Sequence, residues 1–372
     1  KNEFIDKTSK VKDFAEHQWF VRNIPFIEIP DKHIEDVYYY RWSSLKRHLR
    51  YTITGTGYMI TEFVNDIGYA NKFGVINAAG GHQIYEARWL RDTRYAKFGV
   101  INAAGGHQIY EARWLRDTRY AKDYINFYAR GLETGGNHQY SEWIADSAYN
   151  TYLVNGDKEF IVSQLDGFVK IYNDWVDHFE PKLGLYHISP EWDAQEYSAA
   201  SVQTKDQYHG GLGYRPSHNS EMYGNAEAIV KMAQMKGNKD IENEFITKAK
   251  ELRENIIKYL WDTNRLFFFH MQRENNPNNT LLDTREEVGL YPWRFNVPDG
   301  RTNFSLAFSQ LFDSQGFDSQ YGPTTCEMRS KWYDGTQKHQ CCWWNGNSWP
   351  YSTAHILRSL ATHLRQYSQQ NP

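Results

Sequence analysis

The stretch NSEMYGNAEAIVKMAQMKG at residues 219–237 decides the fold, together with NKDIENEFITKAKELRENIIKYLWD, which follows it at residues 238–262. Both segments repeat apolar residues at three- to four-residue spacing, and this periodicity predicts two α-helices. Gly237 and Asn238 separate them, a pair typical of one helix ending and the next beginning. The sequence therefore predicts two helices joined by a tight turn, a helical hairpin.

The same pattern recurs along the chain. Residues 140–156 and 157–179 predict a second hairpin around Asn155-Gly156. Other predicted elements are helices at 31–50 (capped by Asp31), 109–131, 303–312 and 347–366, and a short strand at 265–272. We expect an all-α toroid of helical hairpins, with residues 1–30 as a lead-in or linker and residues 31–372 as one domain.

Long irregular stretches rich in Gly, Pro, Trp and Tyr separate these elements, at 181–218, 263–300 and 316–346. Compact domains keep loops of this length mainly where the loops serve function. We therefore expect the loops to gather over one mouth of the toroid and to carry the functional residues.

An exact duplication interrupts the pattern. The 25 residues KFGVINAAGGHQIYEARWLRDTRYA occur at 72–96 and again, unchanged, at 97–121. Solenoids require three or more diverged units spread through the chain, so two identical copies do not indicate a repeat fold. Only the second copy continues into the predicted helix KDYINFYARG at 122–131. One copy is therefore expected to be surplus, and the duplication an accident rather than a second site.

Composition excludes several classes of partner. The net charge is −3 with 23% charged residues, which leaves no basic surface typical of nucleic-acid binding. No run of about 18 apolar residues predicts a transmembrane helix, and no basic-then-apolar start resembles a signal peptide. The three cysteines form neither a disulfide framework nor zinc-ligand spacing, so we expect no metal and no cofactor. The compartment stays open, since the first residue is Lys1.

Aromatic residues are abundant, with 13 Trp, 27 Tyr and 20 Phe. Such rings stack on sugar faces while their polar groups bond to hydroxyls, so the composition favours a carbohydrate partner. The loop at 187–226 places Glu191, Asp193 and Glu196 beside Trp192 and Tyr197. Bulky rings remove water from a carboxyl group and raise its pKa, which suits a general acid.

Several motifs resemble those of the six-hairpin glycosidases, a group that includes trehalases, mannosyl-oligosaccharide glucosidases and mannosylglycerate hydrolases. PEWDAQEYS at 190–198 resembles the group's GWD-S signature. Five other segments match in the group's order and extend the resemblance over residues 35–366: YEARWLRD (110–117), YRPSHNSEMYGNA (214–226), YLWDTNRLFFF (259–269), EEVGLYPWRF (286–295) and CCWWNGNSWPYSTAHIL (341–357).

The resemblance implies an (α/α)6 toroid and an inverting glycoside hydrolase in which Asp193 is the general acid. It places the substrate-binding residues at Arg113, Trp114, Asp117, Trp192, Tyr214, Arg215, Asn219, Trp344 and Trp349. Pro190 and Glu191 replace the usual Ser-Gly, and Asn345 replaces an Arg, which puts the recognised sugar in question.

The group's catalytic base, a Glu, follows the WNGNSWP helix and is expected beyond Pro372, so we expect a C-terminally incomplete toroid. Glu327 is the candidate base within the chain. Two alternatives stay open: an inactive glycan-binding fragment, and a sugar epimerase or isomerase on the same toroid, which would use histidine pairs.

Overall fold

The computed structural model describes residues 5–51, 58–60, 64, 109–110, 113, 119–129, 140–298, 302–336 and 342–367. The chain divides into two compact units, Lys1–Ile125 and Asn126–Pro372. The duplicated stretch lies almost wholly outside the described residues, so its expected surplus copy stays a prediction. The expected domain limits, 1–30 and 31–372, stay a prediction too.

The first unit is a small helical assembly. Its elements are α1 (Lys7–Val11), α2 (His17–Asn23), α3 (Lys32–His48) and the antiparallel pair β1 (Leu49–Tyr51) and β2 (Tyr58–Ile60). Asp31 caps α3 as expected, because its Oδ1 accepts the backbone N–H groups of His33 at 3.0 Å and Ile34 at 3.1 Å. The core consists of Val11, Phe20, Ile24, Tyr39, Trp42 and Leu45.

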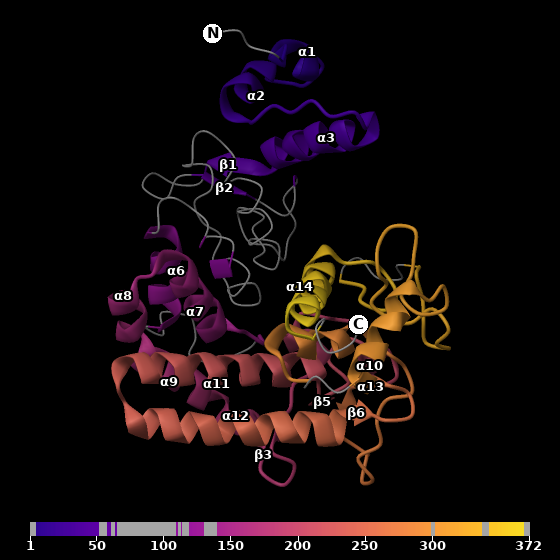
Figure 1. Ribbon diagram of the computed structural model, residues 1–372. Helices are drawn as coiled ribbons and strands as arrows, with labels where there is room; N and C mark the ends of the chain where they lie inside the picture. The colour runs from indigo at the N-terminus through magenta and orange to yellow at the C-terminus, as the bar shows by residue number, and fades with distance from the viewer. Residues whose placement is uncertain are drawn as a thin grey trace. The chain divides into compact units, whose positions relative to one another are not determined.

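The second unit contains the predicted hairpins, and the chain enters it through α6 (Arg119–Ala129). In Figure 1, α11 (Pro216–Lys236) and α12 (Lys239–Leu260) lie side by side and antiparallel. The other helices are α7 (Ile144–Asn155), α8 (Lys158–Ser163), α9 (Leu165–Asn173), α10 (Ala199–Val202), α13 (Thr302–Ser305) and α14 (Pro350–Tyr367).

Short irregular elements connect these helices. The 3-10 helices are η4 (Asp174–His178), η5 (Pro190–Asp193), η6 (Glu287–Phe295) and η7 (Leu306–Phe312). The strands form three antiparallel two-residue pairs. Two are local hairpins, β3 (Phe179–Glu180) with β4 (Leu185–Tyr186) and β6 (Trp261–Asp262) with β7 (Phe267–Phe268), and the third, β5 (Gly213–Tyr214) with β8 (Met271–Gln272), joins two distant loops.

Both hairpin turns form where the sequence predicts them. Gly156 and Gly237 adopt left-handed conformations with φ of 71° and 75°, which glycine tolerates without a steric penalty. The side chain of Asn238 then caps α12 by accepting the N–H group of Ile241 at 3.1 Å. Local turn chemistry therefore defines the hairpins.

Helix α11 is the central element of the second unit. It packs against α12, α7, α9 and η6, and every residue from Pro216 to Ala226 is buried. A Cβ atom added to Gly224 would lie 2.3 Å from Phe295 Cδ1, so α11 and η6 approach each other closely. Asn225 ties α11 to the start of α7, since its Oδ1 accepts the N–H group of Ala145 at 3.1 Å. The polar residues in the first half of α11, up to Asn225, are therefore buried in the protein interior.

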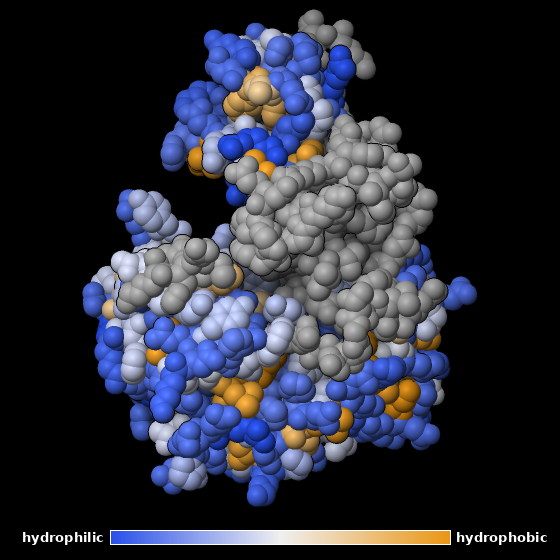
Figure 2. All heavy atoms as spheres, turned by 180° about the vertical axis from the view of Figure 1, so that it is seen from behind, coloured by the Kyte–Doolittle hydropathy of each residue, from blue (hydrophilic) through white to orange (hydrophobic). Residues whose placement is uncertain are grey.

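The described surface on the face shown in Figure 2 is mainly hydrophilic. On the face shown in Figure 2, the hydrophobic residues of the described surface form small separate patches. Across the described ranges, no helix is both long enough and apolar enough to cross a membrane.

Candidate active site

The acidic loop predicted from the sequence is held in an unusual backbone conformation. Pro190 opens η5, and the backbone N–H of Gln195 donates to the carbonyl of Pro190 at 2.8 Å. Ala194 and Tyr197 both have φ of 55°, a left-handed conformation that is uncommon for residues other than glycine. The chain therefore turns sharply directly after Asp193.

Asp193 is buried against the start of α11, with 2% of its surface exposed. Its Oδ2 accepts a hydrogen bond from Arg215 Nε at 2.7 Å and another from the hydroxyl of Ser217. Arg215 is fully buried, and its other groups face Gln195 Oε1 at 2.6 Å and Glu286 Oε2 at 3.6 Å. Asp193 thus balances a buried positive charge. Trp192, which the sequence analysis places beside it as a desolvating ring, packs edge-on against Tyr140 at 5.2 Å.

Glu221 lies one helical turn beyond Ser217 on α11 and is only 1% exposed. Burial raises the pKa of Glu221 well above its usual range, and the nearby negative charge of Asp193 raises it further. A hydrogen bond with Ser141 and the charge of Arg294 oppose this rise. One carboxyl oxygen, Oε2, has no hydrogen-bond partner among the described residues. Glu221 therefore holds a proton close to Asp193, which pairs with Arg215.

Aromatic rings and an arginine surround this carboxyl pair. The guanidinium of Arg294 lies 4.6 Å from the ring of Trp143, and its Nη1 lies 2.8 Å from Nδ1 of His355. The imidazole of His355 stacks on Tyr291 at 4.2 Å. Burial raises the pKa of Tyr351, and the charges of Glu221 and Asp193 add to the rise. The inner ends of α7, α11, η6 and α14 thus meet around one buried polar cluster.

A further buried carboxyl group, that of Glu287, joins η6 to α14. Ser352 donates its hydroxyl to Glu287 Oε2 and in turn accepts a hydrogen bond from Tyr291 at 3.0 Å. Burial raises the pKa of Glu287 well above its usual range. The neutral acid therefore links the two elements without leaving a buried charge.

Asn219, expected to help bind the sugar, makes hydrogen bonds to the protein backbone. Its Oδ1 accepts the N–H group of Tyr186 at 2.8 Å, and its Nδ2 donates to the carbonyls of Tyr186 and Arg215 at 2.8 and 2.9 Å. The side chain is fully buried. Because backbone groups occupy the whole amide, Asn219 joins β4 to α11. Arg215 likewise forms internal ion pairs, and Tyr214 is buried in β5.

The predicted tryptophans on the C-terminal motif form a stacked pair. The rings of Trp344 and Trp349 lie 4.3 Å apart and are inclined by 8°. The backbone N–H of Trp344 donates to the carbonyl of Glu196 at 3.2 Å, which joins this motif to the Asp193 loop. Among the residues expected from the duplicated stretch, Arg113 stacks on the ring of Tyr110 at 4.2 Å, whereas Trp114 and Asp117 lie outside the described residues.

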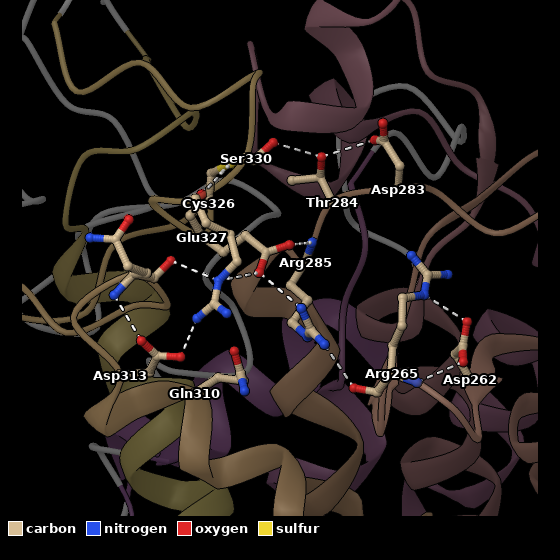
Figure 3. A network of polar contacts seen from close by, with 12 residues as sticks. Asp262, Arg265, Asp283, Thr284, Arg285, Gln310, Asp313, Cys326, Glu327 and Ser330 are labelled. Carbon is tan, nitrogen blue, oxygen red and sulfur yellow. Dashed lines mark hydrogen bonds and ion pairs between the residues drawn. The ribbon is translucent and has the colours of Figure 1, made fainter.

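Glu327, the candidate base, belongs to an ion-pair network (Figure 3). Its Oε1 accepts the backbone N–H of Arg285 at 2.8 Å, and its Oε2 accepts Nη1 of Arg285 at 2.9 Å. Arg329 Nε lies 3.4 Å from the same oxygen and also pairs with Asp313. Two arginines thus neutralise a carboxylate that is 3% exposed, so its contacts are those of a structural residue.

Glu221 and Arg294 were not predicted as site residues. The sequence does contain a signal for Glu221. This carboxyl group follows Ser217 by four residues, so the two side chains share one face of a helix that consists mostly of small and apolar residues. Within the part of the chain that the structure describes, no three His, Cys, Asp or Glu side chains come together as metal ligands.

Residues 97–371 match the family described as the mannosylglycerate hydrolase MGH1-like glycoside hydrolase domain. The chain belongs to this family. The match begins at Lys97, the first residue of the second copy of the duplication. It includes Asp193, Glu221 and the Trp344–Trp349 pair.

The chain also resembles several solved structures. A sialidase is 30% identical with a TM-score of 0.70, and the alignment covers 99% of this chain but 30% of the sialidase. A family 63 mannosylglycerate hydrolase from Thermus thermophilus, in complex with Tris, is 11% identical with a TM-score of 0.53, covering 72% of this chain and 79% of that one. An uncharacterized conserved protein from the same organism is 12% identical with a TM-score of 0.54, covering 71% and 82%. The expected fold, an (α/α)6 toroid of helical hairpins, is confirmed.

Proposed function

We propose that the protein carrying this chain is an inverting glycoside hydrolase in which Asp193 protonates the leaving oxygen. The observation that carries the proposal is the buried pair of Asp193 and Glu221 inside a domain of a glycoside hydrolase family. A general acid needs a proton near neutral pH, and Glu221 holds one beside Asp193. In the proposed mechanism, Glu221 passes this proton to Asp193, which delivers it to the leaving oxygen.

The fixed groups around the pair keep the acid in position. Arg215 and Ser217 hold the Asp193 carboxylate at the start of α11, where the helix dipole also favours negative charge. Glu221 is neutral and almost fully buried, so it is unsuited to attack an anomeric carbon. Water is then the nucleophile, and its attack on the face opposite the leaving group inverts the configuration. We assign the base that activates this water to none of the residues described here.

Hydrolysis by the Asp193→Asn variant tests the proposal. The assay compares methyl and 4-nitrophenyl glycosides of glucose and mannose, because poor leaving groups depend most on a general acid. We expect the variant to lose about 10²–10⁴-fold in kcat/KM on the methyl glycosides. The loss on the activated 4-nitrophenyl glycosides should be smaller. Equal, near-normal rates on both would contradict the role of Asp193.

Glu327→Gln is the matched control for this variant. It also removes a buried carboxylate that balances arginines, Arg285 and Arg329, so it carries a similar cost in stability. We expect it to leave the ratio of the two rates unchanged. Circular dichroism at the assay temperature verifies that both variants are folded.

A second candidate function, glycan binding without turnover, is favoured by one observation. Glu327, the sole candidate for the base that the sequence analysis offers, is neutralised by arginines. Calorimetry that detects oligosaccharide binding by a protein that releases no reducing ends would support this alternative.

A further inference from the structure

The buried arginine behind Asp193 divides its nitrogens among three partners. Arg215 Nε donates to Asp193 Oδ2 at 2.7 Å, and Nη2 donates to Gln195 Oε1 at 2.6 Å. Its third nitrogen, Nη1, lies 3.6 Å from Glu286 Oε2 and forms an ion pair with it. A guanidinium binds one carboxylate most strongly through two parallel N–H groups. Asp193 receives only one such group, from an arginine that a second carboxylate also engages.

The protein backbone holds Glu286 in this place. Glu286 precedes η6 directly and is 4% exposed. Its Oε1 accepts the backbone N–H of Ala200 on α10 at 3.3 Å, and its own backbone forms an isolated antiparallel bridge with Cys326. Because the side chain and the main chain are both tied to other elements, Oε2 stays beside Nη1 of Arg215.

Other titratable side chains near Arg215 and Asp193 are uncharged at neutral pH. They come from α11, η6, α14 and the loop between β7 and β8, and they are Glu221, Tyr291, Tyr351 and His270. Burial raises the pKa of the first three well above their usual ranges. Burial, and then the charge of Arg215, lower the pKa of the histidine well below its usual range. A further cation, Arg294, acts on the glutamate of α11 and the tyrosine of α14. Burial opposes the charge of Arg215 itself, and the charges of Glu286 and then Asp193 outweigh burial and raise its pKa.

We propose that Glu286 is a positioning residue that shares the charge of Arg215 with Asp193, and thereby leaves Asp193 able to take up a proton. The inference rests on the proposed function, in which Asp193 receives a proton from Glu221 before it delivers one. A cation next to a carboxyl group favours the ionised form, so an arginine devoted to Asp193 would oppose this uptake. An arginine divided between two carboxylates opposes it less. Glu286 acts only through Arg215 and contacts no reacting atom.

The titration of Asp193 measures this sharing directly. Carbon-13 NMR of protein labelled at the aspartate carboxyl carbon follows protonation with pH, and the signal that is absent from Asp193→Asn belongs to Asp193. Glu286→Gln keeps the shape of the side chain and removes its charge. We expect the midpoint of the Asp193 signal to fall by about one pH unit in this variant. A signal that titrates at the same pH in both proteins, or titrates in neither, overturns the inference.

Two further variants assign the effect to the charge of Glu286. Glu286→Asp keeps the charge but moves it back by one methylene group, so the midpoint should fall by less than in Glu286→Gln. If only Glu286→Asp folds, as circular dichroism shows, an unmoved midpoint in it overturns the inference. Glu327→Gln removes another buried carboxylate that is paired with arginines, and it should leave the midpoint of Asp193 in place. An equal fall in Glu327→Gln also overturns the inference.

Hydrolysis of the methyl glycosides gives a second measurement. A loss of stability alone would leave the shape of the kcat/KM pH profile unchanged, whereas Glu286→Gln should keep a near-normal rate at low pH and move the alkaline limb down by about one pH unit. A folded Glu286→Gln variant that loses activity equally at every pH contradicts the inference. The NMR midpoint does not depend on hydrolysis, so the two proposals can fail separately. An unmoved midpoint, together with hydrolysis that requires Asp193, defeats this inference and leaves the proposed function intact. A lowered midpoint in a protein that Asp193→Asn does not impair has the opposite meaning.

Discussion

At the scale of single residues, the decisive feature is that two buried carboxyl groups have different partners: one pairs with an arginine, and the other holds a proton. Arg215 stabilises Asp193 as a carboxylate, while burial keeps Glu221 protonated. The pair resists losing its last proton, since two adjacent negative charges in a buried site repel each other.

The Glu221→Gln variant measures this effect. Glutamine keeps the volume and the hydrogen bond to Ser141 but has no proton to exchange. We expect the alkaline limb of the kcat/KM pH profile to move down by at least about one pH unit, because the site would then lack the proton that Glu221 holds. An alkaline limb that does not move would show that Glu221 takes no part in proton delivery.

At the scale of elements, the site depends on the close packing of α11 against η6. Gly224 provides the clearance for the ring of Phe295. Gly224→Ala gains about 0.5–1 kcal/mol of helix stability, yet the added methyl group forces the ring aside at a cost of about 1–3 kcal/mol.

We therefore expect Gly224→Ala to lower the free energy of unfolding by about 1 kcal/mol in urea titrations. The control is Lys231→Ala, at an exposed position of the same helix, which should stay within about 0.5 kcal/mol of the unaltered protein. A stabilised Gly224→Ala variant would mean that α11 and η6 pack less tightly than described.

At the scale of the whole molecule, the sequence predicts what local chemistry determines. The hairpins follow from helical periodicity, from Gly156 and Gly237 at the turns, and from the cap at Asn238, all of which act within a few residues. The (α/α)6 toroid follows from the hairpins together with the motif resemblance. The catalytic role of Asp193 was predicted from its own motif and stays a prediction, and the structure buries this residue beside α11.

The partners of Asp193 could not be predicted in the same way. Glu221 and Arg294 approach it only when α11, η6 and α14 pack together, and no local pattern encodes that packing. The contacts of Asn219 have the same origin, because its amide bonds to the backbone of β4, a strand of two residues without sequence periodicity. The 3-10 helix η6 was expected as part of a loop, since Pro292 and Gly289 disfavour a regular helix.

The measurement that tests the central claim most directly is the configuration of the first product. Proton NMR follows a 4-nitrophenyl glycoside during hydrolysis and records the anomer that appears before mutarotation. Our account predicts that an α-glycoside first releases the β-sugar, and that Asp193→Asn releases it far more slowly from the matching methyl glycoside. Release of the α-sugar from an α-glycoside, or hydrolysis that Asp193→Asn leaves unchanged, would contradict the account.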